Sequence, residues 1–178
     1  MPPHGNDYRL LTYLKFLEKM KSEQDKIFMR EAIAQSFVGM RNGEGGPFGC
    51  VIVKDGKIIG RGNNRVLKDN DPTAHAEVTA IRDACKNLNH FQLTGCVVYT
   101  SCEPCPMCLG AIYWARPDRI VYACTRQDAA AIDFDDEFLY GEFTKPMAQR
   151  LIPIQPLLRE EGLAAFIEWQ TKQNKTPY

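Results

Sequence analysis

The sequence contains no long apolar run, and none of its hydrophobic stretches approaches the roughly 20 residues that cross a membrane. Near its start it also lacks the short apolar core and small-residue cleavage site of a secretory signal peptide. We therefore expect a cytoplasmic protein with no membrane partner. At 178 residues, a single domain with a core of its own is the default.

An excess of positive charge is missing as well. The chain has 22 Lys and Arg residues against 22 Asp and Glu residues, so its formal net charge is zero. Proteins that bind nucleic acids usually carry a basic patch, so a nucleic acid partner is not expected. The glycine-rich turn Gly43–Gly49 lacks the Gly-Lys-Ser/Thr of a phosphate-binding loop. Its glycines would instead let the backbone pass close to a ligand or another chain.

Cysteine, in contrast, is plentiful. The seven cysteines are Cys50, Cys85, Cys96, Cys102, Cys105, Cys108 and Cys124. Their number is odd, and three are crowded between positions 102 and 108. In a reducing cytoplasm thiols stay free, so this cluster favours metal binding over disulfides.

The hydrophobic pattern indicates a mixed α/β fold. Apolar residues at helical spacing predict helices at Tyr8–Lys21 and Lys26–Met40. Asp55-Gly56 is a strong turn signal and predicts a hairpin of strands 50–53 and 57–61. Further elements are expected at 74–88 (helix), 96–100 (strand), 106–114 (helix), 119–123 (strand), 151–154 (strand) and 160–172 (helix). This order predicts a three-layer α/β protein with a mixed sheet.

Two short segments carry the chemistry. His75-Ala76-Glu77 is followed about thirty residues later by Cys105-Pro106-Met107-Cys108. His75, Cys105 and Cys108 supply three zinc ligands, which is the number that leaves a fourth position open for water. Glu77 is then free to take a proton from that water and deliver it to a substrate. Both segments are expected at helix N-termini, where the helix dipole favours thiolate over thiol.

Two other metal sites fit parts of the pattern. If Glu77 were a fourth ligand, the zinc site would be closed and structural. Cys102, Cys105 and Cys108 also have the spacing that opens an iron–sulfur motif. That motif needs a fourth cysteine followed by proline soon afterwards, whereas the next cysteine, Cys124, comes sixteen residues later and precedes a threonine.

At this point the chain resembles the cytidine-deaminase-like superfamily, whose signature is H-x-E…P-C-x-x-C. More closely, residues 71–82 (DPTAHAEVTAIR), residues 100–117 (TSCEPCPMCLGAIYWARP) and residues 45–49 (GGPFG) are similar to small bacterial, zinc-dependent guanine deaminases. The resemblance covers roughly residues 26–178. Residues 1–25 have no counterpart and are expected to form a helical extension.

The resemblance implies an α/β/α sandwich with a mixed five-stranded sheet and one zinc ion per subunit. It implies hydrolysis of guanine to xanthine and ammonia by a zinc-bound hydroxide. Glu77 would act as proton shuttle, and Asp136 would help to protonate the leaving amine. The residues expected to contact the purine base are Asn64, Phe48, Ala76, Trp114 and Tyr178.

The same resemblance implies a homodimer in which the C-terminal segment, from about residue 150 to 178, is swapped onto the partner subunit. Tyr178 would then close the neighbouring pocket. One position departs from the family pattern: Asp133 stands where a glycine is expected before Phe134-Asp135-Asp136.

Other substrates and roles stay open. Guanosine is the first rival, because a nucleoside enzyme of this branch would share the metal motifs. Cytosine and tRNA adenosine are further candidates, although a neutral chain lacks the basic residues that bind phosphates. Outside the enzymes, a structural zinc module remains an alternative. Asn64 could also be a simple turn residue, Phe48 and Trp114 core aromatics, and Asp136 part of a solvated loop.

Overall fold

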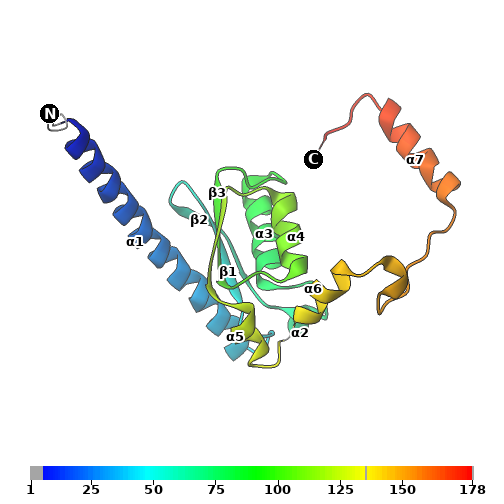
Figure 1. The fold of residues 1–178 in the computed structure, drawn as a ribbon, viewed down its shortest axis with the longest axis horizontal. Helices are drawn as coiled ribbons and strands as arrows, with labels where there is room; N and C mark the ends of the chain where they lie inside the picture. The colour runs from blue at the N-terminus through cyan, green and yellow to red at the C-terminus, as the bar shows by residue number, and fades with distance from the viewer. Residues whose placement is uncertain (1–5, 135, 178) are drawn as a thin grey trace. The chain divides into compact units, whose positions relative to one another are not determined.

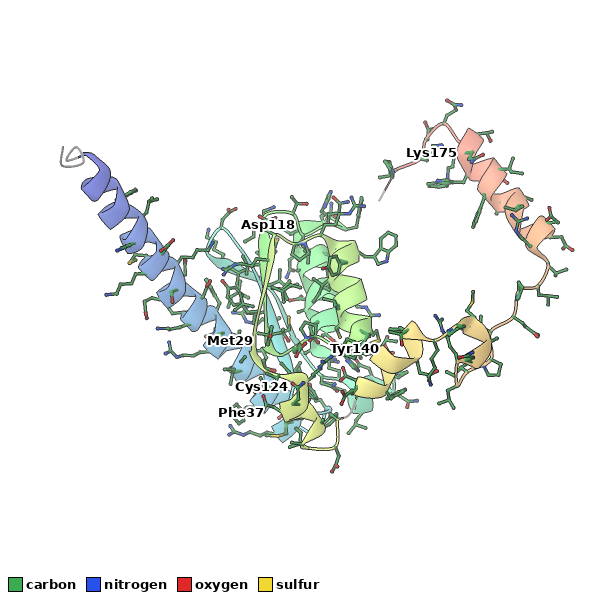
Figure 2. The ribbon with its side chains drawn as sticks, in the orientation of Figure 1. Met29, Phe37, Asp118, Cys124, Tyr140 and Lys175 are labelled. Atoms are coloured by element: carbon green, nitrogen blue, oxygen red, sulfur yellow. The ribbon has the colours of Figure 1, made fainter. Side chains whose placement is uncertain are left out.

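A four-stranded mixed sheet forms the centre of the fold (Figure 1). The structure is a computed structural model and describes residues 6–134 and 136–177. The strands are β1 (Gly49–Lys54), β2 (Lys57–Asn63), β3 (Cys96–Cys102) and β4 (Arg119–Cys124), in the order β2-β1-β3-β4. β1 pairs antiparallel with β2 and β3, whereas β3 and β4 are parallel. Cys124, labelled in Figure 2, is the last residue of β4.

Alternate residues of the strands face two separate helical layers. Val51, Val53 and Tyr99 pack against Phe28 and Ala32 of α1 (Asn6–Arg41). The intervening residues of the same strands, among them Cys50, Ile52 and Val98, pack against α3 (Ala76–Leu88) and α4 (Pro106–Ala115). This period of two places one apolar row on each face of the sheet. The predicted three-layer architecture with a mixed sheet is confirmed.

The first helix differs from the prediction. α1 runs without interruption for 36 residues, where two helices were expected on either side of residues 22–25. Those four residues, Ser-Glu-Gln-Asp, include neither glycine nor proline, so nothing ends the helix there. An ion pair one turn apart, between Glu23 and Lys26 (2.8 Å), also crosses this segment.

The hairpin turn follows its sequence signal. Asp55 and Gly56 both have positive φ angles, of 49° and 71°, as the two central residues of a type I′ turn require. β2 then brings its glycines against α3. A Cβ atom on Gly62 would lie 2.2 Å from the carbonyl oxygen of Ala76, so only glycine permits this approach. The close packing fixes where α3 begins, and with it the position of His75.

The chain divides into two compact units, with the boundary between Glu137 and Phe138. The shorter helices α2 (Val66–Asp69) and α5 (Arg126–Ala130) belong to the first unit. α6 (Glu137–Thr144) begins at the boundary, and a 3₁₀ turn (Met147–Gln149) and α7 (Arg159–Thr171) follow. None of residues 138–177 is buried, although many of them are large and apolar.

The expectation of a fifth strand is wrong for the described residues, in which the sheet has four. Leu151–Ile154 forms bends and irregular backbone rather than a strand. Pro153 lies inside this segment and Pro156 just after it, and neither has an N–H group to donate to a neighbouring strand. Across residues 6–134 and 136–177, no helix has the length and apolar character to cross a membrane.

Candidate active site

A cavity of about 470 Å³ opens at the end of the first unit that holds the start of α3 and the loop before α4. The glycine-rich turn, the segment after β2, α5 and the loop that follows α5 complete its walls. Six of the residues singled out in the sequence line it: Phe48, Asn64, His75, Glu77, Cys105 and Asp136. Residues from five separate parts of the chain therefore meet at one place.

The three expected metal ligands form one group. Nδ1 of His75 lies 3.6 Å from Sγ of Cys105 and 3.5 Å from Sγ of Cys108, and all three donor atoms lie within 4.8 Å of one another. Tetrahedral zinc with ordinary Zn–N and Zn–S bond lengths would separate its nitrogen and sulfur ligands by about 3.6 Å. The donor set and its spacing therefore fit zinc, with one imidazole and two sulfur ligands.

Both ligand segments lie at helix starts, as expected. His75 is the N-cap residue of α3, one position before the predicted first turn, and Cys105 is the N-cap of α4 with Pro106 at the first helical position. The backbone N–H of Cys108 donates to Sγ of Cys105 at 3.5 Å. Hydrogen bonds from the Cys108 thiol and from His75 lower the pKa of Cys105 to about 4, despite its burial. These hydrogen bonds favour the thiolate form of Cys105, which is the form that binds zinc.

Glu77 is buried, with 6% of its surface exposed, yet its side chain reaches the cavity. The hydroxyl of Thr100 donates to its Oε1 at 3.0 Å. Burial raises the pKa of Glu77, so its carboxyl group takes up a proton more readily than a solvated one does. Among the described residues the metal-binding group contains His75, Cys105 and Cys108 but not Glu77.

Cys102 also lines the cavity without joining the metal-binding group. Burial raises the pKa of Cys102 to about 12, which keeps it a neutral thiol. An iron–sulfur site would need Cys102 as a thiolate ligand next to Cys105 and Cys108, whereas His75 is the third member of the group here. This arrangement favours the zinc interpretation.

Two aromatic side chains form an apolar wall. The rings of Phe48 and Phe134 meet edge to face, with centroids 5.0 Å apart and an interplanar angle of 87°. The buried amide of Asn64 lies beside them, and its Oδ1 accepts the backbone N–H of Val66 at 3.2 Å. Asn64 is therefore both a turn residue and a cavity residue, so the two interpretations of this position are compatible.

The remaining expected residues have different places. Ala76 is fully buried at the start of α3, and Trp114 on α4 is 68% exposed; neither is among the residues that line the cavity. Tyr178 lies outside the described residues, as does Asp135. The cavity also includes residues to which no role was assigned, notably Phe134, Glu103 and Arg126. Phe134 and Glu103 sit within the family segments and could have been proposed from them, whereas Arg126 has no distinguishing sequence signal.

Comparisons with known proteins place these features in a family. Residues 22–124 match the cytidine and deoxycytidylate deaminase zinc-binding region. The chain is 54% identical to guanine deaminase of Bacillus subtilis over 151 residues, which cover 85% of this chain and 97% of the relative. It is 35% identical to the tRNA-specific adenosine deaminase of Haemophilus influenzae, over 80% of this chain and 90% of that protein.

A solved structure of a relative has a similar fold. The crystal structure of guanine deaminase from Bacillus subtilis superposes with a TM-score of 0.84 at 54% identity, and the match covers 86% of this chain and 98% of that one. The matched region includes the whole metal-binding group, and the fold, the ligand set and the buried glutamate agree with the signature of zinc deaminases. The chain belongs to the zinc-dependent cytidine and deoxycytidylate deaminase family.

Proposed function

We propose that this protein is a hydrolase that converts guanine and water to xanthine and ammonia. The similarity to a guanine deaminase across 97% of that relative's length carries the choice of substrate. The cavity supports the choice, because it places the metal-binding group and Glu77 beside an apolar aromatic wall. A small planar base with a polar edge suits a slot of this composition.

The residues of the cavity have complementary roles in this reaction. His75, Cys105 and Cys108 would hold a zinc ion, and that ion would supply the Lewis acidity that activates water as a nucleophile at neutral pH. Glu77, with its raised pKa, takes the proton of the attacking water and passes it to a ring nitrogen of the base. Asp136, on the same cavity, helps to carry the second proton of the attacking water to the departing amine, because nitrogen leaves more readily as ammonia than as an anion.

The base is held by contacts that differ in kind. Phe48 and Phe134 pack against the ring, and the amide of Asn64 hydrogen-bonds to its polar edge. Ala76, the residue after the zinc ligand His75, is proposed to contact the base as well. In this proposal Trp114 helps to wall the ring, and Tyr178 closes the pocket of the partner subunit.

The proposed assembly is a homodimer in which residues from about 150 to 178 cross to the partner subunit. The apolar side chains of this region, such as Leu151, Phe166 and Trp169, are exposed within their own chain. Apolar surface of this extent favours burial against another surface. None of the seven cysteines, all of which lie within the described residues, forms a disulfide; this suits a reducing compartment, and we place the protein in the cytoplasm on that ground.

The test is an ammonia-release assay with purified, zinc-loaded protein against guanine, guanosine, cytosine, cytidine and adenine. We expect guanine to give the highest kcat/KM. Faster turnover of guanosine or cytosine would show that the proposed substrate is wrong. If protein with one zinc per chain turned over none of these compounds, the protein would instead be a structural zinc module. Size-exclusion chromatography with light scattering tests the dimer.

A further inference from the structure

Glu44 lies in the glycine-rich turn, next to the cavity but not in its lining. Its side chain is only 12% exposed, which is low for a carboxylate in a turn. Its Oε2 accepts a hydrogen bond from Nδ2 of Asn63 at 2.7 Å, and its Oε1 accepts one from Nζ of Lys68. Nη1 of Arg65 lies 3.9 Å from Oε2. This carboxylate therefore has three partners, of which Asn63 is the last residue of β2, and Arg65 and Lys68 lie in the segment that follows it.

The main chain of Glu44 adds a second set of links to the same segment. Its carbonyl oxygen accepts the backbone N–H groups of Leu67 at 3.1 Å and of Lys68 at 3.0 Å. These are the second and third N–H groups of α2, and the first, that of Val66, donates to Oδ1 of Asn64. The start of this four-residue helix is thus satisfied entirely by Glu44 and Asn64.

Of the residues that Glu44 contacts directly, Leu67 lines the cavity, and so do neighbours of these contacts. Gly45, Asn64, Val66 and Leu67 all line it. Gly45, the next residue after Glu44, packs so tightly on Asn64 that a Cβ atom there would lie 2.1 Å from Oδ1. The turn therefore cannot move toward Asn64 without displacing its amide.

We propose that Glu44 is a positioning residue that holds Asn64 and the start of α2 in the geometry that binds the base. This inference rests on the proposed function, in which Asn64 hydrogen-bonds to guanine. Hydrogen bonds from Lys68 and Asn63 lower the pKa of Glu44, so the charged form that accepts both is present at neutral pH. Misplacement of a binding group by about 1 Å can cost up to about 100-fold in catalytic efficiency.

The experiment compares Glu44→Ala with Glu44→Gln and with Glu31→Ala, an exposed carboxylate on α1 that serves as the matched control. Guanine turnover, zinc content and the thermal midpoint are measured for each. We expect Glu44→Ala to raise KM about tenfold while kcat changes by less than about threefold, with one zinc per chain retained. Glu44→Gln keeps one acceptor oxygen and should fall between the wild type and Glu44→Ala, whereas Glu31→Ala should match the wild type.

A second variant keeps the test decisive if Glu44→Ala folds poorly. Lys68→Met removes a partner of the same carboxylate from the exposed side of α2, and its rise in KM should be non-additive with that of Glu44→Gln, because both changes break one contact. Guanine affinity, measured by calorimetry in a Glu77→Gln background, should fall in parallel with the rise in KM.

The two levels of inference fail differently. If the wild-type protein does not deaminate guanine, the proposed function is wrong. If the wild type does so and all the Glu44 and Lys68 variants keep its KM within about twofold, the positioning role is wrong. A loss confined to kcat, or accompanied by loss of zinc, would likewise contradict it, since Glu44 touches neither the metal ligands nor Glu77.

Discussion

At the scale of single residues, Glu77 shows how burial prepares a side chain for proton transfer. Its carboxyl group is held by the Thr100 hydroxyl in an interior position that raises its pKa, yet it borders the cavity. A carboxylate with these properties can accept a proton at one moment and donate it at another. The side chain does not belong to the donor group His75, Cys105 and Cys108, so its removal should not empty the metal site.

We expect Glu77→Gln to lose at least about 100-fold in kcat, because the amide cannot carry a proton between water and base. Zinc content should remain one per chain by elemental analysis. Asp83→Asn, the same chemical change on α3 away from the cavity, provides the control and should stay active. A Glu77→Gln protein with wild-type activity would remove Glu77 from the mechanism.

Asp133 illustrates a residue whose backbone conflicts with its type. It has a φ angle of +67°, in the left-handed region that favours glycine. The N–H groups of Asp133 and Phe134 donate to the carbonyls of Ala130 and Ala129, the pattern of a Schellman motif at a helix end. Glycine is usual at this position of the motif, which explains why the family pattern has glycine here.

Asp133→Gly should therefore stabilise the protein by about 0.5–1 kcal/mol, since the relief of backbone strain outweighs the greater freedom of glycine in the unfolded chain. Asp133→Ala keeps a Cβ atom without the local hydrogen-bonding capacity of aspartate and should destabilise it. Urea denaturation of the two variants gives the comparison. Equal stabilities would show that the φ angle is not the source of strain.

At the scale of elements, an ion pair fastens α1 to the sheet. Nη1 and Nη2 of Arg119 on β4 donate to the two carboxylate oxygens of Asp25 at 2.8 and 2.7 Å, and the hydroxyl of Tyr99 on β3 donates to Oδ1 at 2.6 Å. The side chains of Asp25 and Arg119 are only about one fifth and one third exposed. Asp25 is the last residue of the expected extension, so α1 is already attached to the sheet where that extension was predicted to end.

The pH dependence of this contact follows from its chemistry. The hydrogen bonds from Arg119 lower the pKa of Asp25, so its contribution to stability is complete above the unfolded value near 3.9 and is lost as the pH falls through the folded pKa. We expect Asp25→Asn to lower the free energy of unfolding by about 1–2 kcal/mol at pH 7, a figure that is discounted for partial exposure. The difference in this free energy between variant and wild type should shrink below about pH 4.

Urea titrations at several pH values measure this effect. Glu23→Gln, which removes an exposed carboxylate one turn away from Lys26, is the control and should change stability little at any pH. A cost for Asp25→Asn that is independent of pH down to pH 3 would show that packing, rather than the charge, is responsible.

The elements also show where the sequence pattern was informative. Asp55-Gly56 predicted its hairpin because the turn geometry depends on those two residues alone. The metal ligands were predictable for a related reason: their type and spacing carry the chemistry. The expected break in α1 and the strand at Leu151–Ile154 were wrong, because a polar stretch need not end a helix and an apolar stretch needs a pairing partner to become a strand. The place of Arg126 in the cavity depends on tertiary contacts that no local pattern encodes.

At the scale of the whole molecule, the metal site joins elements that are distant in sequence. His75 caps α3 and Cys105 caps α4, and the two helices pack on the same face of the sheet. Neither is one of the Ser, Thr, Asp or Asn residues that best satisfy free N–H groups at a helix start. The beginnings of both helices are therefore expected to depend on metal binding more than ordinary helix ends do.

Removal of zinc with a chelator should lower the thermal midpoint and abolish turnover, and added zinc should restore both. Cys105→Ser should reproduce the metal-free behaviour without a chelator. Cys124→Ser changes an exposed cysteine outside the metal-binding group and should behave as wild type. If the protein kept its thermal midpoint after the chelator had removed zinc, its folding would not depend on metal binding.

The glycine-rich wall of the cavity has a consequence for how this enzyme could be redesigned. A Cβ atom at Gly45 or Gly46 would lie 2.1 or 2.7 Å from neighbouring side chains, so neither position tolerates a larger residue. Glycine has no side chain to shorten, so these positions cannot enlarge the cavity. Leu67, on α2, also lines the cavity but is 72% exposed, so it can be shortened at little cost to the core. In a library that randomises Gly45, Gly46 and Leu67, variants that accept bulkier purines should carry changes at position 67 and keep the two glycines. New substrate specificity should therefore arise from substitutions in α2, with the glycine-rich turn unchanged.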